Sequence, residues 1–159
     1  MSERLIFGVT FAGALGCALM AGLLLAFSVG VMPALNRVPT PNAITTMQSI
    51  NVAILNPLFG LVFFGTTATT VVLALSAPFT WQERGAVWRL VGGLLFVVGT
   101  FVVTVACNVP LNDSLAAIDP QSAKGAAVWE HYRTAWTAWN HVRTIAGVGA
   151  AASLIRAQL

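Results

Sequence analysis

Long apolar stretches separated by short polar segments dominate the chain. Three of these stretches contain no Asp, Glu, Lys or Arg: residues 5–36, 38–82 and 90–112. A transmembrane helix needs roughly 20 predominantly apolar residues, so each stretch is long enough to cross a bilayer. The pattern predicts spans at about residues 5–32, 52–77 and 86–109.

A fourth span is predicted at about residues 134–155, where His141 and Arg143 interrupt the apolar pattern. Its helix should begin earlier, at residues 125–129, after the longest polar stretch of the chain. The fold class is therefore all-α without a sheet, because helices satisfy their backbone groups within lipid. We expect an integral membrane four-helix bundle that forms one transmembrane domain over residues 1–159.

Prolines mark the expected helix boundaries. Pro33 should end the first helix and Pro110 the third, because proline lacks an N–H group and clashes with the preceding turn. Two prolines within residues 36–42 predict a short loop. A helix should then start near Asn42, with Thr40 or Asn42 as its cap, and continue into the second span.

Composition and charge agree with a membrane setting. Hydrophobic residues make up 57% of the chain and charged residues only 8%, against a usual charged share of about 25%. The net charge of +3 comes from scattered basic residues, which argues against a nucleic-acid partner. One set of connecting segments holds Arg4, Arg84, Arg89 and Arg156, and the other holds Arg37, Lys124 and Arg133. The larger set predicts a plasma (inner) membrane protein with both termini in the cytoplasm.

Polar side chains within the spans gather in one leaflet. They open the second span, close the third and open the fourth, and they are Gln48, Asn51, Asn56, Asn108, Asn112, Trp136, Asn140, His141 and Arg143. Two sets share a helix face: Thr100, Thr104, Asn108 and Asn112, and Trp129, Arg133, Trp136, Asn140 and Arg143. Unpaired amides in hydrocarbon are costly, so both faces should point into the bundle.

Arg143 is the most informative of these residues, because a charged side chain near mid-membrane costs about 2.5–3.5 kcal/mol. It should be buried and bonded to Asn side chains or carbonyl groups of other spans. It either serves a site or locks the helix ends together. The asparagines can equally be glue between helices. His141 is either a general base at the pocket edge or a neutral partner between helices.

Metal and cofactor sites have little support in the sequence. The chain contains two histidines, and no ligand pair has the spacing of a zinc or copper site. Neither a glycine-rich nucleotide loop nor a nucleophile motif is present. Cys17 and Cys107 are expected to be packing residues. We therefore expect neither a cofactor nor a bound metal.

Several sequence blocks occur in order along most of the chain: residues 26–35 (AFSVGVMPAL), residues 47–51 (MQSIN), Asn56-Pro57, residues 108–112 (NVPLN), Trp136, Trp139-Asn140 and Arg143. Together these blocks resemble the anthrone oxygenase-like family of small four-helix membrane proteins. The resemblance implies a four-helix bundle. By analogy with fungal members that oxidise anthrones to anthraquinones, it also implies oxygenation of a polyaromatic phenol without an evident cofactor.

This implied activity assigns roles to the polar residues. Trp136 and Trp139 would line an aromatic slot, Arg143, Asn108 and Asn140 would hold an oxyanion, and His141 would take the proton. The remaining substrate-binding candidates are Gln48, Asn51, Asn56 and Asn112. The alternatives are a non-catalytic membrane module that binds a lipid, a quinone or a partner protein, and a transporter whose pore a homo-oligomer supplies. In each case the expected ligand is a hydrophobic small molecule or a lipid.

Overall fold

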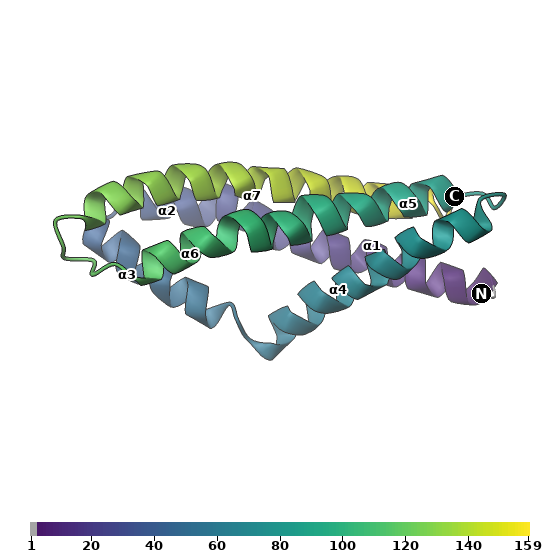
Figure 1. Ribbon diagram of the computed structural model, residues 1–159, viewed down its shortest axis with the longest axis horizontal. Helices are drawn as coiled ribbons and strands as arrows, with labels where there is room; N and C mark the ends of the chain where they lie inside the picture. Colours follow the sequence, from purple (N-terminus) through teal and green to yellow (C-terminus); the bar gives the residue numbers. More distant parts are fainter. Residues whose placement is uncertain (1–2) are drawn as a thin grey trace.

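The computed structural model describes residues 3–159, and this part of the chain consists of helices and short connections without a strand (Figure 1). The first rod joins α1 (Glu3–Ala26), the π turn η1 (Phe27–Val31) and α2 (Met32–Leu35). After it come α3 (Thr40–Ala53), α4 (Pro57–Ser76) and the short 3₁₀ helix η2 (Ala77–Thr80). The next rod joins α5 (Ala86–Leu94), η3 (Leu95–Val102), η4 (Thr104–Asn108) and α6 (Val109–Ala116), and α7 (Gly125–Arg156) completes the bundle.

The all-α prediction is confirmed. When each continuous rod is counted as one helix, the described residues form five helices where we expected four: the first rod, α3, α4, the rod from α5 to α6, and α7. The predicted continuous helix into the second span is broken between α3 and α4. Pro57 is the first residue of α4, where its missing N–H leaves no helical hydrogen bond unmade, and Asn56 adopts an extended conformation and caps α4. Its Oδ1 accepts a hydrogen bond from the Phe59 N–H at 3.0 Å, and its Nδ2 donates to the Ala53 carbonyl at 3.1 Å. Asn56 thus satisfies backbone groups on both sides of the break.

Other predicted boundaries also need correction. α3 begins at Thr40 after Pro39, and neither Thr40 nor Asn42 provides a side-chain cap. The first and third helices continue through Pro33 and Pro110 instead of ending there. In each case the preceding turn widens: the N–H of Met32 donates to the Phe27 carbonyl, and that of Val109 to the Thr104 carbonyl. A wider turn accommodates the proline ring without ending the helix.

The helices run lengthwise beside one another (Figure 1). α1 packs against α7 and α4, and α5 packs against α4 and α7. The described chain ends lie at the same end of the bundle as the α4–α5 connection, while residues 36–39 and 117–124 form the opposite end. α3 and α4 form a V whose apex points away from the other helices. α7 begins at the 36–39 end and packs against the first rod, so its first half can form a site together with the end of that rod.

Two hydrophobic clusters fill the interior. One lies toward the chain ends and includes Cys17, Phe63, Phe96 and Leu154. The other lies toward the opposite end and includes Met32, Ile44, Met47, Leu115 and Tyr132. Cys17 is a fully buried free thiol in the first cluster, in agreement with its expected packing role. Along α7, a layer of buried polar residues separates the two clusters.

Three helical rods are long and apolar enough to cross a membrane: Glu3–Leu35, Pro57–Thr80 and Ala86–Ala116. This property indicates a membrane protein. Their outward faces carry large apolar side chains, among them Phe7, Phe11, Leu61, Phe64 and Val98, each more than half exposed. Such surfaces are suited to contact with lipid acyl chains.

Close contact between α4 and α5 depends on Gly93. A Cβ atom at this position would lie 2.6 Å from the Thr70 carbonyl oxygen, a backbone atom that cannot rotate away. We expect Gly93→Ala to destabilise the protein by about 1–3 kcal/mol through overpacking. Thermal unfolding of the detergent-solubilised protein measures the effect. Gly65→Ala is the control, since nothing lies within 4 Å of its added Cβ atom. Equal losses in both variants would contradict the packing argument.

Candidate functional site

Arg143 is the centre of the buried polar layer and is only 5% exposed. Its Nη2 donates to Asn140 Oδ1 at 2.7 Å, and its Nη1 donates to Thr104 Oγ1 at 3.2 Å. Its Cζ lies 5.1 Å from the centroid of the Trp136 ring, within the range of a cation–π contact. The predicted burial is confirmed. The partners differ in part, because the Asn lies on the same helix and the other span contributes a hydroxyl group.

Asn140 connects Arg143 to the first rod. Asn140 is fully buried, and its Nδ2 donates to the Leu24 carbonyl at 2.8 Å and to Ser28 Oγ at 2.7 Å. Its amide therefore uses both hydrogens toward the first rod and its oxygen toward Arg143. A buried amide satisfied in this way holds α7 and the first rod in a fixed register.

The polar stripe predicted on the third helix does face α7. Thr100 Oγ1 donates to the Arg143 carbonyl at 3.2 Å, and Asn108 Nδ2 donates to the Trp136 carbonyl at 3.2 Å. Nearer the loops, the Tyr132 hydroxyl donates to Asn112 Oδ1 at 2.9 Å. The Thr100 and Asn108 bonds, together with the bond from Arg143 to Thr104, tie one predicted face to the other.

The amides of the second predicted span have separate environments. Gln48 Nε2 donates to the carbonyls of Leu115 and Ile118, at 2.8 and 2.9 Å, and thereby satisfies the end of α6. Asn51 Nδ2 donates weakly to the Tyr132 hydroxyl at 3.4 Å. Asn56 is exposed as the cap of α4 and forms no recorded contact with the polar layer. The break before α4 turned this residue away from the site.

Tyr132 is a site residue that the sequence reasoning missed. It is fully buried, and its ring stacks between Trp129 and Trp136 at centroid distances of 5.6 and 6.1 Å. Its hydroxyl group accepts a hydrogen bond from Asn51 and donates one to Asn112. Its position three residues after Trp129 and four before Trp136 was the available signal.

Three atoms of the polar layer have no hydrogen-bond partner within the described residues. They are Asn108 Oδ1, Trp136 Nε1 and Arg143 Nε. Their residues are each at most 5% exposed. Buried polar atoms are normally satisfied, so this layer retains donor and acceptor capacity.

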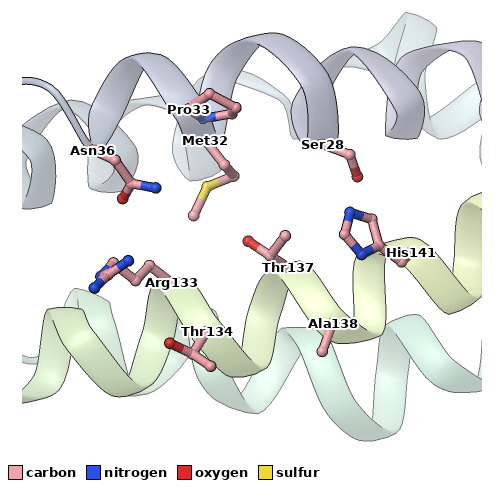
Figure 2. Close-up of a pocket in the computed structure, with 9 residues that line it drawn as sticks. All are labelled: Ser28, Met32, Pro33, Asn36, Arg133, Thr134, Thr137, Ala138 and His141. Carbon is pink, nitrogen blue, oxygen red and sulfur yellow. The ribbon is translucent and has the colours of Figure 1, made fainter.

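An open groove of about 360 Å³ runs between the first rod and α7 (Figure 2). Its wall on the first rod is formed by Ser28, Met32, Pro33 and Asn36, and its wall on α7 by Arg133, Thr134, Thr137, Ala138 and His141. His141 is exposed here, and its imidazole is directed across the groove toward Ser28. Ser28 thus lines the groove while its Oγ accepts from buried Asn140. The sequence reasoning had not singled out Ser28.

The two tryptophans assigned to an aromatic slot lie in different environments. Trp136 is 5% exposed and contacts Arg143, whereas Trp139 is 41% exposed. Neither lines the groove. Arg133, also expected to face inward, lines the groove and pairs with Glu130 on the outer side of α7.

Two further observations concern charge. Within residues 3–159, no three His, Cys, Asp or Glu side chains lie close enough together to hold a metal ion. A second buried arginine, Arg89, lies at the opposite end of the bundle, where it pairs with Glu83 at 3.0 Å and donates to Thr80 Oγ1 at 2.9 Å. Because Arg89 contacts Thr80 and Glu83, it stabilises the connection between α4 and α5 and is not part of the polar layer.

Substitution of Asn140 tests the structural weight of the polar layer. Asn140→Leu leaves Arg143 Nη2 without its acceptor inside the bundle, so we expect a loss of about 2–3 kcal/mol in the free energy of unfolding. Denaturant titration in detergent measures this loss. His141→Leu provides the neighbouring control, because His141 is exposed and should change stability by less than about 0.5 kcal/mol. Equal stability of the two variants would rule out the proposed bridging role of Asn140.

Comparison with known proteins adds a family relationship. Residues 57–153 match a family model described as anthrone oxygenase, and this range exceeds half of the 159-residue chain. It includes α4, the third rod and most of α7, and therefore Asn108, Asn140, His141 and Arg143. Searches of curated proteins and of solved structures found no match.

Proposed function

Since this chain belongs to the anthrone oxygenase family, we propose that it oxidises an anthrone-like polyaromatic phenol with dioxygen. One observation carries the assignment to particular residues: the groove presents His141 opposite Ser28, whose Oγ is hydrogen-bonded to the buried Asn140–Arg143 pair. The groove volume of about 360 Å³ lies within the usual range of about 300–1,000 Å³ for small-molecule sites. A base on the α7 wall thus faces a hydroxyl group on the first-rod wall, and that hydroxyl is connected to the buried cation through Asn140.

The chemistry of an anthrone requires these two features. Its CH₂ carbon lies between two aromatic rings and opposite a carbonyl group, so loss of one proton places negative charge on the carbonyl oxygen. The carbanion form attacks dioxygen, and a C–O bond forms to give a hydroperoxide after protonation. Cleavage of the O–O bond with loss of the second C–H proton releases water and leaves a quinone. One anthrone and one O₂ therefore give one anthraquinone and one water.

In this proposal, His141 removes the first proton from the substrate. Its exposure in the groove allows the imidazole to reach a bound substrate. Arg143, Asn140 and Asn108 lie behind the groove wall and favour the oxyanion through the positive charge and oriented dipoles of a buried layer. Dioxygen and a flat aromatic substrate both partition into lipid, which suits an open groove on a membrane protein.

Substitution of His141 tests this function. The expected result for His141→Ala is a fall of about 10²–10⁴ in kcat for oxygen uptake with anthrone, measured above the spontaneous rate. His131→Ala is the matched control, because His131 is exposed on α7 outside the groove.

Unchanged turnover in His141→Ala would contradict the assigned role. Wild-type protein that binds an anthraquinone but consumes no oxygen with anthrone would instead favour the non-catalytic binding module.

We also propose that α7 is the fourth membrane span, with both termini in the cytoplasm. Its outward face carries Val142, Ile145, Val148 and Ile155, which are 42–72% exposed. Its polar residues Asn140, Arg143 and Thr144 are buried. Inward polar residues lower the average hydropathy of α7 even though its outer face is suited to lipid.

Site-specific labelling tests this topology. In a variant in which both native cysteines are replaced, single cysteines are introduced at Gln82, Ser122 and Gln158. An impermeant maleimide added to intact cells should label Ser122→Cys, while Gln82→Cys and Gln158→Cys react only after the membrane is permeabilised. Labelling of Gln158→Cys together with Ser122→Cys would show that α7 does not cross, and a fully reversed pattern would refute the orientation.

A further inference from the structure

The hydroxyl group of Ser28 has an unusual hydrogen-bond environment for a helical serine. Ser and Thr hydroxyls within helices commonly donate to the carbonyl four residues earlier. Thr10, Thr104 and Ser153 all do so here, at 2.7, 2.7 and 2.8 Å. The corresponding acceptor for Ser28 is the Leu24 carbonyl, but this oxygen receives a hydrogen bond from Asn140 Nδ2 at 2.8 Å.

Asn140 also sets the direction in which Ser28 can donate. The second hydrogen of the same Nδ2 group is donated to Ser28 Oγ at 2.7 Å, so this oxygen already accepts from the buried side. The hydroxyl proton has no recorded acceptor in the part of the chain that the structure describes. Because Ser28 lines the groove and faces His141, its proton is available to an acceptor inside the groove (Figure 2).

Arg143 places its positive charge next to the Asn140 amide. Arg143 Nη2 donates to Asn140 Oδ1 at 2.7 Å, which polarises the amide and strengthens its N–H donation to Ser28. Asn140 is fully buried and Arg143 is 5% exposed, so solvent screens this chain weakly. A cation that does not line the groove can therefore act there through two hydrogen bonds.

We propose that Ser28 is the residue that donates a hydrogen bond to the substrate oxyanion, with Asn140 and Arg143 as positioning residues behind it. This inference rests on the proposed function for the reaction that creates the oxyanion. When His141 takes the proton from carbon, negative charge grows on the carbonyl oxygen across the groove. The Ser28 hydroxyl stabilises that charge, and no covalent bond to Ser28 forms or breaks.

Oxygen-uptake kinetics provide the first test. Ser28→Ala should lower kcat by about 10²–10³ with little change in KM, because the donor acts on charge that appears after deprotonation. Ser28→Thr retains the hydroxyl and should recover most of the rate. Ser153→Ala is the matched control, since it removes another buried hydroxyl far along α7. Wild-type kcat in a folded Ser28→Ala variant would overturn the proposal.

A double-mutant cycle separates a relay from a merely structural role. Arg143→Gln should also lower kcat, but the Ser28→Ala/Arg143→Gln variant should be no slower than Ser28→Ala alone. This result is expected because Arg143 acts through the hydroxyl that the first substitution removes. Multiplying effects would show that Arg143 acts independently of Ser28 and would overturn the relay.

A binding experiment tests the donor without turnover. The dihydroxyanthraquinone alizarin changes absorbance when its phenol ionises, so its titration midpoint can be followed in the bound state. The midpoint should be about one pH unit higher on Ser28→Ala than on wild type or Ser28→Thr, because the hydroxyl favours the anion. His141 and Arg133 also line the groove and remain present in all three proteins.

Equal midpoints, or failure of alizarin to bind the wild-type protein, would overturn the donor role. The expected midpoint difference together with no oxygen uptake by wild type would instead reject the proposed oxygenase function and leave the anion site in place.

Discussion

The burial of Arg143 is the constraint on which the rest of the polar architecture depends. Among residues 3–159, no carboxylate forms an ion pair with it, so uncharged groups must satisfy the guanidinium. Thr104, Asn140 and the Trp136 ring contact it from two helices, while its Nε has no hydrogen-bond partner among the described residues. Each of these groups then occupies a fixed position. In turn, Asn140 binds Leu24 and Ser28, which connects the buried cation to the first rod.

Backbone geometry brings these partners within reach. Ser28 lies in η1 and Thr104 and Asn108 lie in η4, and each of these π turns ends two residues before a proline. Wide turns of this kind are frequent at functional sites because they change which side chains face a neighbouring helix. The break before α4 has the opposite effect, since it places Asn56 on the outside. Local backbone irregularity therefore decides which polar side chains join the layer.

The sequence predicted much of this arrangement because lipid imposes strong rules. Charge-free stretches identified the apolar helices, and a spacing of three and four residues placed Asn108, Asn140 and Arg143 on inward faces. Sequence rules were less informative at prolines, because a proline can either separate two helices or be accommodated within one. Pro57 stands where α3 and α4 are separated, whereas Pro33 and Pro110 follow wider turns inside continuous helices.

The role of Ser28 was hidden for a different reason. A serine within a helix normally satisfies itself on its own backbone, so its type and spacing contain no signal for a site. Only the structure shows that Asn140 donates hydrogen bonds to the Leu24 carbonyl and to Ser28 Oγ. It also shows that Ser28 lines the groove. Tyr132 was also overlooked, although its spacing of three and four residues from Trp129 and Trp136 placed it on their face of the helix.

In this proposal, the groove beside His141 binds an aromatic oxyanion. The Ser28 hydroxyl donates a hydrogen bond to it, and Asn140 and Arg143 position that hydroxyl. The most direct measurement is an experimental structure of the full chain with a bound hydroxyanthraquinone. The account predicts that the ligand lies between the first rod and α7, with an oxygen within hydrogen-bond distance of Ser28 Oγ and a ring carbon facing His141. A ligand bound elsewhere, or one in the groove with its oxygens directed away from Ser28, would contradict the account.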